Sequence, residues 1–362
     1  MTKSKSDKIR NIALAGHAGA GKTTLAEALL AKTGSIPGPG AVTKGTTVCD
    51  FEPQEIQLQH SVDTALCNFE HEGTRINIID TPGYPDFLGR SISILPAVET
   101  VAIVINAQAG IEISTRRMMR VAADRKICRM IIINRIDEPE TDLHGLLQEI
   151  RDVFGNVCLP LNLPAEGGKK VLDCFFSPSS ASADFESVAS AHTEIIDQVV
   201  EVDEKLMELY LEQGEDLSPE QLHAPFEKAL REGHLIPVCF VSAEKGTGIS
   251  ELLHVFANLM PAPSEGNPPL FLSGEGESAR SVTIRPDANA HAIAHVFKIS
   301  IDPYIGKLGV MRVHQGRITP GSQLFIGDAR KPFKVNHLYR LQGKEHKEIA
   351  EAVPGDMCAV AK

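Results

Sequence analysis

The residues best suited to chemistry form one string near the amino terminus, Gly16-His17-Ala18-Gly19-Ala20-Gly21-Lys22-Thr23. It fits the pattern G-x-x-x-x-G-K-[ST], whose glycines permit a loop that aims several backbone N–H groups at phosphate. A helix that begins here adds the positive end of its dipole. We predict that Gly16 to Thr24 bind phosphate, that Lys22, exposed in an empty site, reaches the β- and γ-phosphates, and that Thr23 offers a hydroxyl to Mg²⁺.

A second motif, Asp80-Thr81-Pro82-Gly83, closes an apolar run that is typical of a strand. An aspartate in this place can hold Mg²⁺ through water, and the Gly83 N–H can contact a γ-phosphate. D-x-x-G alone is a common turn. Its position downstream of a phosphate-loop motif favours the functional interpretation.

A third motif predicts which base is bound. Asn134-Arg135-Ile136-Asp137 follows another apolar run, and the Asp137 carboxylate can accept both N–H donors of guanine's N1/N2 edge. Adenine would leave that carboxylate unpaired. Arg135 could stack on the base through its flat guanidinium. Ser242-Ala243 would add a backbone N–H to the guanine carbonyl. The order of the motifs favours GTP and GDP over ATP.

The elements that must position these motifs alternate along the first half of the chain, which predicts an α/β fold with a mostly parallel sheet. Strands are predicted at Asn11–Ala15, Val101–Asn106, Met130–Asn134 and His234–Ser242, and helices at Lys22–Lys32 and Ile249–Leu259. Ser61–Glu70 and Arg75–Asp80, joined by a short link that ends at Gly73, predict an antiparallel hairpin. The glycine- and proline-rich stretch Thr33–Gly45 predicts a mobile connection.

An insertion, residues 157–233, interrupts this alternation. Apolar residues from Val188 to Leu209 recur at helical spacing and predict one long helix capped by Gly214. Ser218-Pro219-Glu220-Gln221 predicts the start of a second helix that ends near Gly233. We therefore predict a G domain over residues 1–260, a linker over 261–289, and a small β-barrel over 290–362 that is truncated at its carboxyl end.

Composition limits the classes of function. No run of eighteen apolar residues is present, the amino terminus lacks the apolar stretch of a signal peptide, and the seven cysteines form no C-x-x-C pair. We expect a cytoplasmic protein without a disulfide framework. A formal net charge of −11 argues against indiscriminate nucleic-acid binding, although not against a local basic patch.

The motifs GHAGAGKTTL, DTPGYPDF, NRID and VSA, with the insertion and GKLGVMRVHQGRITPG, resemble the elongation factor G family. The resemblance covers essentially the whole chain and implies a Ras-like G domain with an inserted subdomain followed by a β-barrel. It also implies GTP or GDP and Mg²⁺ as ligands, and the ribosome as partner of a protein that is monomeric away from it.

Three departures from the family pattern qualify that resemblance. Gly19 replaces an aspartate of the phosphate loop. The switch element R-G-I-T is missing, so that Ser61 lies opposite the threonine that binds Mg²⁺, with Thr64 as a competitor. Tyr84 replaces the histidine that positions the attacking water, although it could also be a surface aromatic without a catalytic part.

The expected function is therefore a ribosome-associated translational GTPase with weak intrinsic activity, in which Lys22, Gly83 and Tyr84 act in catalysis. Two alternatives stay open: a GTP-dependent ribosome-binding module that hydrolyses very slowly, and a ribosomal-protection or release-type factor. The sequence does not distinguish translocation from ribosome recycling.

Overall fold

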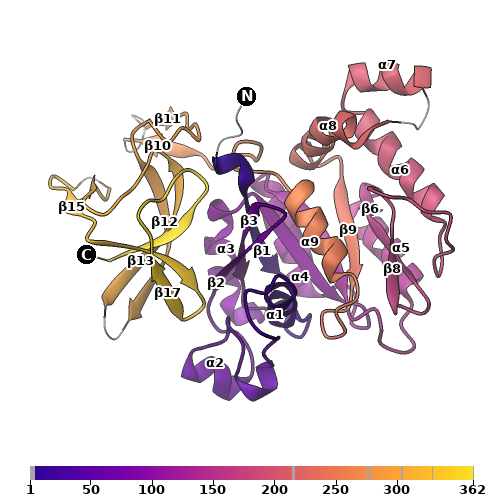
Figure 1. Cartoon of the computed structure of the whole chain (residues 1–362), viewed down its shortest axis with the longest axis horizontal. Coiled ribbons are helices and arrows are strands. Elements are labelled where there is room, and N and C mark those ends of the chain that lie inside the picture. Colours follow the sequence, from indigo (N-terminus) through magenta and orange to yellow (C-terminus); the bar gives the residue numbers. More distant parts are fainter. Residues whose placement is uncertain are drawn as a thin grey trace.

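The computed structural model describes residues 5–213, 217–274, 276, 279–302, 305–327 and 329–361. A seven-stranded sheet in the order β2-β3-β1-β4-β5-β9-β6 forms the centre of the amino-terminal part (Figure 1). Every neighbouring pair is parallel except β2 and β3. The strands are β1 (Ile9–Ala15), β2 (Ala65–His71), β3 (Thr74–Asp80), β4 (Thr100–Asn106), β5 (Cys128–Asn134), β6 (Cys158–Pro160) and β9 (Ile236–Val241).

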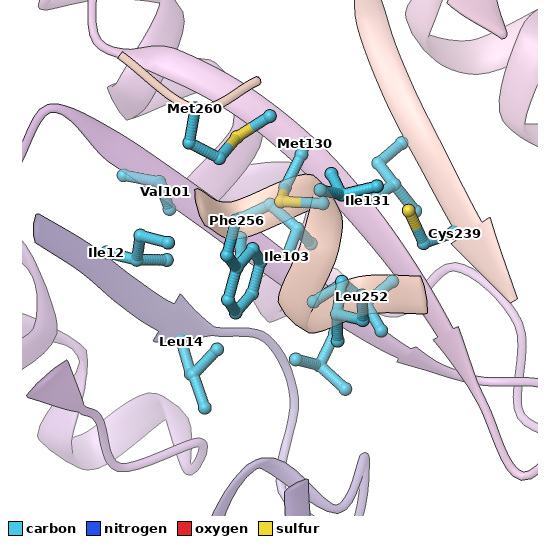
Figure 2. Close-up of a cluster of buried hydrophobic side chains, with 14 of the residues drawn as sticks. Ile12, Leu14, Val101, Ile103, Met130, Ile131, Cys239, Leu252, Phe256 and Met260 are labelled. Carbon is cyan, nitrogen blue, oxygen red and sulfur yellow. The ribbon is translucent and has the colours of Figure 1, made fainter. Parts of the chain in front are cut away.

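Helices cover this sheet, which explains why its central strands are continuous apolar runs. Every residue of β1 and β9 is buried. The helices of this part are α1 (Lys22–Lys32), α2 (Pro53–Leu58), α3 (Leu88–Ser93), α4 (Ile113–Asp124), α5 (Leu143–Phe154) and α9 (Ile249–Asn258). Figure 2 shows part of the core, where Leu252 and Phe256 of α9 lie among side chains of β1, β4 and β5.

The predicted hairpin is confirmed, but its first strand begins at Ala65 rather than Ser61. Residues 61–64 form a loop because side chains satisfy its backbone: Glu55 accepts hydrogen bonds from the N–H groups of Val62 and Asp63. The short helix α2 was not predicted, although Pro53 at its first turn is a start signal. Residues 33–45 contain a short 3₁₀ turn, Val42–Lys44, and their mobility stays a prediction.

The insertion is joined to the central sheet, because β6 pairs in parallel with β9. It continues with the hairpin β7 (Asn162–Ala165) and β8 (Lys170–Asp173) and with α6 (Val188–Val200), α7 (Glu204–Gln213) and α8 (Pro219–Glu232). The predicted single long helix is wrong. The chain breaks before α7, where the Asp203 carboxylate accepts the N–H of Leu206 and so caps a new helix.

The helix-start signal at Ser218 is confirmed, because Ser218 and Gln221 form a reciprocal capping box. Gly233 ends α8 in a left-handed conformation. The predicted cap at Gly214 lies outside the described residues.

The carboxy-terminal part is an antiparallel sheet in the order β12-β13-β18-β16-β17, which we call the carboxy-terminal sheet. Its strands are β12 (Ile293–Asp302), β13 (Gly306–Gln315), β16 (His337–Gln342), β17 (Glu345–Glu348) and β18 (Met357–Ala361), and β14 (Gln323–Leu324) pairs with β15 (Phe333–Lys334) beside it. The stretch 261–289, predicted as a linker, contains a hairpin of β10 (Phe271–Ser273) and β11 (Arg280–Val282). In Figure 1 the carboxy-terminal sheet lies on the β2 side of the molecule, opposite the helices of the insertion.

A buried polar network joins the two parts. Arg312 of β13 is fully buried, and its guanidinium donates to Glu99 at 2.7 Å and to the Gly355 carbonyl at 2.6 Å. Asn11 of β1 donates to the same carboxylate at 2.8 Å.

Among the residues that the structure describes, no helix is both long and apolar enough to cross a bilayer.

Candidate nucleotide-binding site

The phosphate loop, residues 16–23, turns sharply between β1 and α1 because its three glycines, Gly16, Gly19 and Gly21, take backbone conformations that other residues avoid. Gly16 has φ +136°, and a Cβ there would lie 2.3 Å from the Val104 carbonyl oxygen. Gly21 has φ +86°, and a Cβ there would lie 2.5 Å from the Asn134 amide nitrogen. Glycine at both positions lets the loop pack against β4 and β5.

Lys22 is buried, which corrects the expectation of an exposed side chain. Its ammonium group donates to the carbonyls of His17 at 2.8 Å and Gly16 at 3.1 Å, because these carbonyls lie within reach across the loop. Burial lowers the pKa of Lys22 to about 8, although the charges of Asp80 and Asp50 oppose this change. A bound phosphate would favour the charged form.

The expected metal ligands gather at the start of α1. The Thr23 hydroxyl donates to Asp80 at 2.7 Å and lies 3.3 Å from the Ser61 hydroxyl. The structure therefore brings Ser61 beside Thr23. Thr64, the competing candidate, is also buried, and its backbone N–H donates to Asp63 at 2.8 Å.

Asp50 joins this cluster and was not predicted as a site residue. Neither of its carboxylate oxygens makes a well-formed hydrogen bond within the described part of the chain, even with the nearby Ser61 hydroxyl. One oxygen of Asp80 is likewise buried without a partner. Burial, and then the neighbouring Asp50, raise the pKa of Asp80 to about 7. Two buried carboxylates and two hydroxyls form the oxygen-only donor set that Mg²⁺ prefers, so the residues fit that ion.

Asn134 connects the phosphate loop to the turn after β9. Its amide donates to the Ala20 carbonyl at 2.9 Å, and its oxygen accepts the Ala243 N–H at 3.0 Å. The Ser242 N–H donates to Thr247. Both backbone donors expected to reach a base are thus engaged within the protein, so a base would have to take the Ala243 N–H from Asn134 or use another group of this turn.

The remaining base-reading residues lie after β5. Arg135 adopts φ +66° and forms an ion pair with Glu138 at 3.1 Å. Asp137 is half-buried.

One cavity of about 570 Å³, large enough for a nucleotide, joins these features. Predicted site residues that line it are Ala18, Gly19, Gly21, Lys22, Thr23, Thr24, Ser61, Gly83, Tyr84, Arg135 and Ala243. Gly16, His17, Ala20, Asp80, Asn134, Asp137 and Ser242 are predicted site residues that do not line it. Gly83 comes very close to the loop, since a Cβ there would lie 2.5 Å from both the Ala18 nitrogen and the Lys22 ammonium group.

Tyr84, which follows Gly83, is 42% exposed and packs against a histidine that was not among the predicted site residues. The rings of His60 and Tyr84 have centroids 4.4 Å apart and an interplanar angle of 52°. Both residues line the cavity. Sequence spacing gave no signal for this pair, because the two residues are brought together only by the fold.

The segment Gln59–Thr64, which carries His60 and Ser61, is also held from the carboxy-terminal sheet. Lys298 of β12 donates to the Thr64 carbonyl and forms an ion pair with Asp63 at 3.3 Å. Arg90 of α3 donates to the Val62 carbonyl at 2.8 Å. The site wall thus contains contacts from both parts of the molecule.

A mostly parallel sheet, a glycine-bearing loop between its first strand and helix, and the Asn134 turn after β5 define a P-loop nucleotide-binding protein. Residues 7–262 match the family model of the elongation factor Tu GTP binding domain, and residues 291–362 match that of elongation factor G domain 2. The chain therefore belongs to the elongation factor G family of translational GTPases.

Individual relatives agree. The chain is 32% identical to an elongation factor G-like protein of Mycobacterium tuberculosis and 29% identical to elongation factor G of Thermotoga maritima, in each case over 98% of this chain and 53% of the relative. The crystal structure of a protein from Thermus thermophilus matches with a TM-score of 0.82 and 33% identity, over 98% of this chain and 52% of that one. The chain thus spans about half the length of these relatives.

Proposed function

We propose that this protein binds GTP and GDP with Mg²⁺, hydrolyses GTP, and uses the reaction to change its conformation on the ribosome. The observation that carries the proposal is the single cavity that joins the phosphate loop, the Ser61 hydroxyl and the Arg135–Ala243 base region. The names of the relatives support the translational role. A cytoplasmic protein that is monomeric away from the ribosome fits the same proposal.

In this mechanism the protein positions groups and stabilises charge. The loop N–H groups and the Lys22 ammonium would neutralise the phosphates, and the N–H of Gly83, a residue that closely approaches Ala18 and Lys22 of the loop, would contact the γ-phosphate. Thr23, Ser61, Asp50 and Asp80 would hold Mg²⁺, which supplies positive charge at the β- and γ-oxygens when it is bound. Loss of the γ-phosphate would release the 59–64 segment.

Ribosome binding is tested by co-sedimentation of the full-length protein with ribosomes. We expect retention with a non-hydrolysable GTP analogue and release with GDP. Equal sedimentation with both nucleotides and with none would contradict a nucleotide-controlled ribosomal role.

Base selection gives a sharper test. Calorimetric titration should show GTP binding at least about 100-fold tighter than ATP binding, because Asp137 pairs only with guanine's N–H edge. Asp137→Asn should transfer the preference to xanthine nucleotides, whose C2 carbonyl suits an amide donor. A wild-type protein that binds ATP as tightly as GTP would show that the base site is misassigned.

A second candidate is a GTP-dependent binding module that hydrolyses extremely slowly, and the observation in its favour is Tyr84 beside Gly83. Phosphate release in a single turnover, with and without ribosomes, separates it from the leading proposal. A protein that binds GTP and ribosomes but releases no phosphate in either condition is such a module.

A further inference from the structure

A histidine, His60, lines the cavity against Tyr84, the residue that follows the motif Asp80–Gly83. His60 reaches this place because α2 ends at Gln59, whose left-handed backbone (φ +55°) turns the chain back toward the phosphate loop. The next residue is Ser61, whose hydroxyl lies 3.3 Å from that of Thr23. His60 is therefore within one residue of the expected metal cluster.

The hydrogen bond of His60 defines the chemistry of its ring. Its Nδ1 lies 3.2 Å from the Ser61 carbonyl oxygen, which can only accept a hydrogen bond, so Nδ1 carries the proton in this arrangement. In the neutral ring Nε2 then has a free lone pair. No other protein atom within the described ranges hydrogen-bonds to this ring. The ring lines the cavity and can accept a hydrogen bond from water there.

Aromatic neighbours fix the orientation of this ring. Tyr84 packs against one part of it at 4.4 Å between centroids, and Phe87 lies at 6.3 Å. The Tyr84 ring thus has a role other than that of a surface aromatic, because it packs against the imidazole of His60.

We propose that His60 is the water-positioning residue for GTP hydrolysis in this protein, with Tyr84 as its packing support. The inference rests on the proposed function and deepens it. The water oxygen bonds to the γ-phosphorus while the bond from that phosphorus to the β–γ bridging oxygen breaks. GDP leaves with that electron pair, and the proton of the water ends on inorganic phosphate. His60 Nε2 accepts a hydrogen bond from the water and orients it.

The experiment measures single-turnover phosphate release at saturating GTP, with and without ribosomes, together with the Kd for GTP. His60→Ala should slow release about 10- to 100-fold with the Kd changed less than about 2-fold. His60→Gln, which keeps a hydrogen-bond acceptor, should recover part of the rate. His234→Ala, an exposed histidine outside the cavity, is the matched control and should match the wild type.

Two variants of Tyr84 identify the acting group. Tyr84→Phe keeps the ring against His60 and should slow release far less than His60→Ala. Tyr84→His in the His60→Ala background restores an imidazole beside Gly83 and should recover the rate. A gain of equal size from Tyr84→His in the otherwise wild-type protein would show that the new imidazole acts independently of His60.

Other results overturn the assignment. If His60→Ala hydrolyses GTP as fast as the wild type, or if Tyr84→Phe is slowed equally, His60 does not position the water. These outcomes leave the proposed GTPase function intact. A wild type that binds GTP but releases no phosphate, alone or on ribosomes, overturns both proposals.

Discussion

At the scale of single residues, the site concentrates buried charge that the protein alone does not neutralise. Asp50 and Asp80 are both buried beside Lys22, and together the two carboxylates outnumber the one nearby ammonium group. Burial disfavours the ionised form of each carboxylate. This arrangement costs stability in the empty protein and would be relieved by a divalent cation, which agrees with the Mg²⁺ site proposed above.

The charge cost gives a prediction for nucleotide-free protein without divalent cations. Because the pKa of Asp80 is raised to about 7, the native state binds a proton that the unfolded state releases between about pH 4 and pH 7. Stability should therefore fall as pH rises through this window. Asp80→Asn lacks this titrating group. The free energy of unfolding of the variant minus that of the wild type should therefore increase by on the order of 2–4 kcal/mol between about pH 4.5 and pH 8.

The measurement is urea denaturation of both proteins in EDTA at these two pH values. Adding Mg²⁺ should stabilise the wild type more at the higher pH than at the lower one, since the ion then does not compete with a proton. A difference between wild type and variant that is the same at both pH values would show that Asp80 is ionised throughout.

Site residues that belong to a local sequence motif could be predicted. Site residues whose partners are distant in the sequence could not. The phosphate loop follows from glycine conformations and a helix start, which are local properties. Asp50 and His60 lie in a polar stretch with no periodic signal, and their neighbours in the fold, Asp80 and Tyr84, are more than 20 positions away in the sequence. The engagement of the Ala243 N–H by Asn134 likewise depends on contact between two separate strand ends.

At the scale of elements, Glu55 of α2 organises the 59–64 segment. It is buried, and it accepts the N–H groups of Val62 at 3.1 Å, Asp63 at 3.2 Å and Glu52 at 3.3 Å. This side chain replaces the ladder hydrogen bonds that an earlier start of β2 would have supplied. A short helix thus determines where the strand begins.

Glu55→Ala should loosen this segment selectively. Three N–H groups lose their acceptor, at a cost of about 1–3 kcal/mol. Amide hydrogen exchange measured by mass spectrometry should accelerate over residues 59–64 and remain unchanged in β1 and β4. Gln57→Ala, on the exposed side of α2, is the control. Unchanged exchange over 59–64 would show that other contacts are sufficient to hold the segment.

Hydrophobic runs predicted which segments of the G domain are helices and which are strands. They did not predict where a helix is interrupted or where a very short strand forms. The apolar spacing continues across residues 201–203, so periodicity alone could not reveal that Asp203 starts a new helix. The three residues of β6 are too few for a pattern and become a strand only by pairing with β9.

At the scale of the whole molecule, the ion pair between Arg312 and Glu99 ties the carboxy-terminal sheet to the central sheet. Both side chains are buried, and burial lowers the pKa of Arg312 while it raises that of Glu99. Such a pair is costly to break from one side, because the remaining charge stays buried without its partner.

Glu99→Gln should therefore destabilise the protein by about 3–5 kcal/mol. The double variant Glu99→Gln/Arg312→Met should cost less than the sum of the two single variants, because it removes both charges. Chemical denaturation of the wild type, both single variants and the double variant gives this coupling directly. Costs that simply add would indicate that the pair contributes no interaction across the interface.

The contacts of Lys298 with Thr64 and Asp63 connect the carboxy-terminal sheet mechanically to the 59–64 segment. Thermodynamic linkage is reciprocal. If a ligand in the cavity strengthens the contact between the 59–64 segment and β12, that contact strengthens ligand binding by the same free energy. A force that pulls the carboxy-terminal sheet away would then lower the affinity for the ligand. A bound ligand would make the connection between the two parts more rigid. The Lys298 contacts with Thr64 and Asp63 are the direct link through which such coupling would act in both directions.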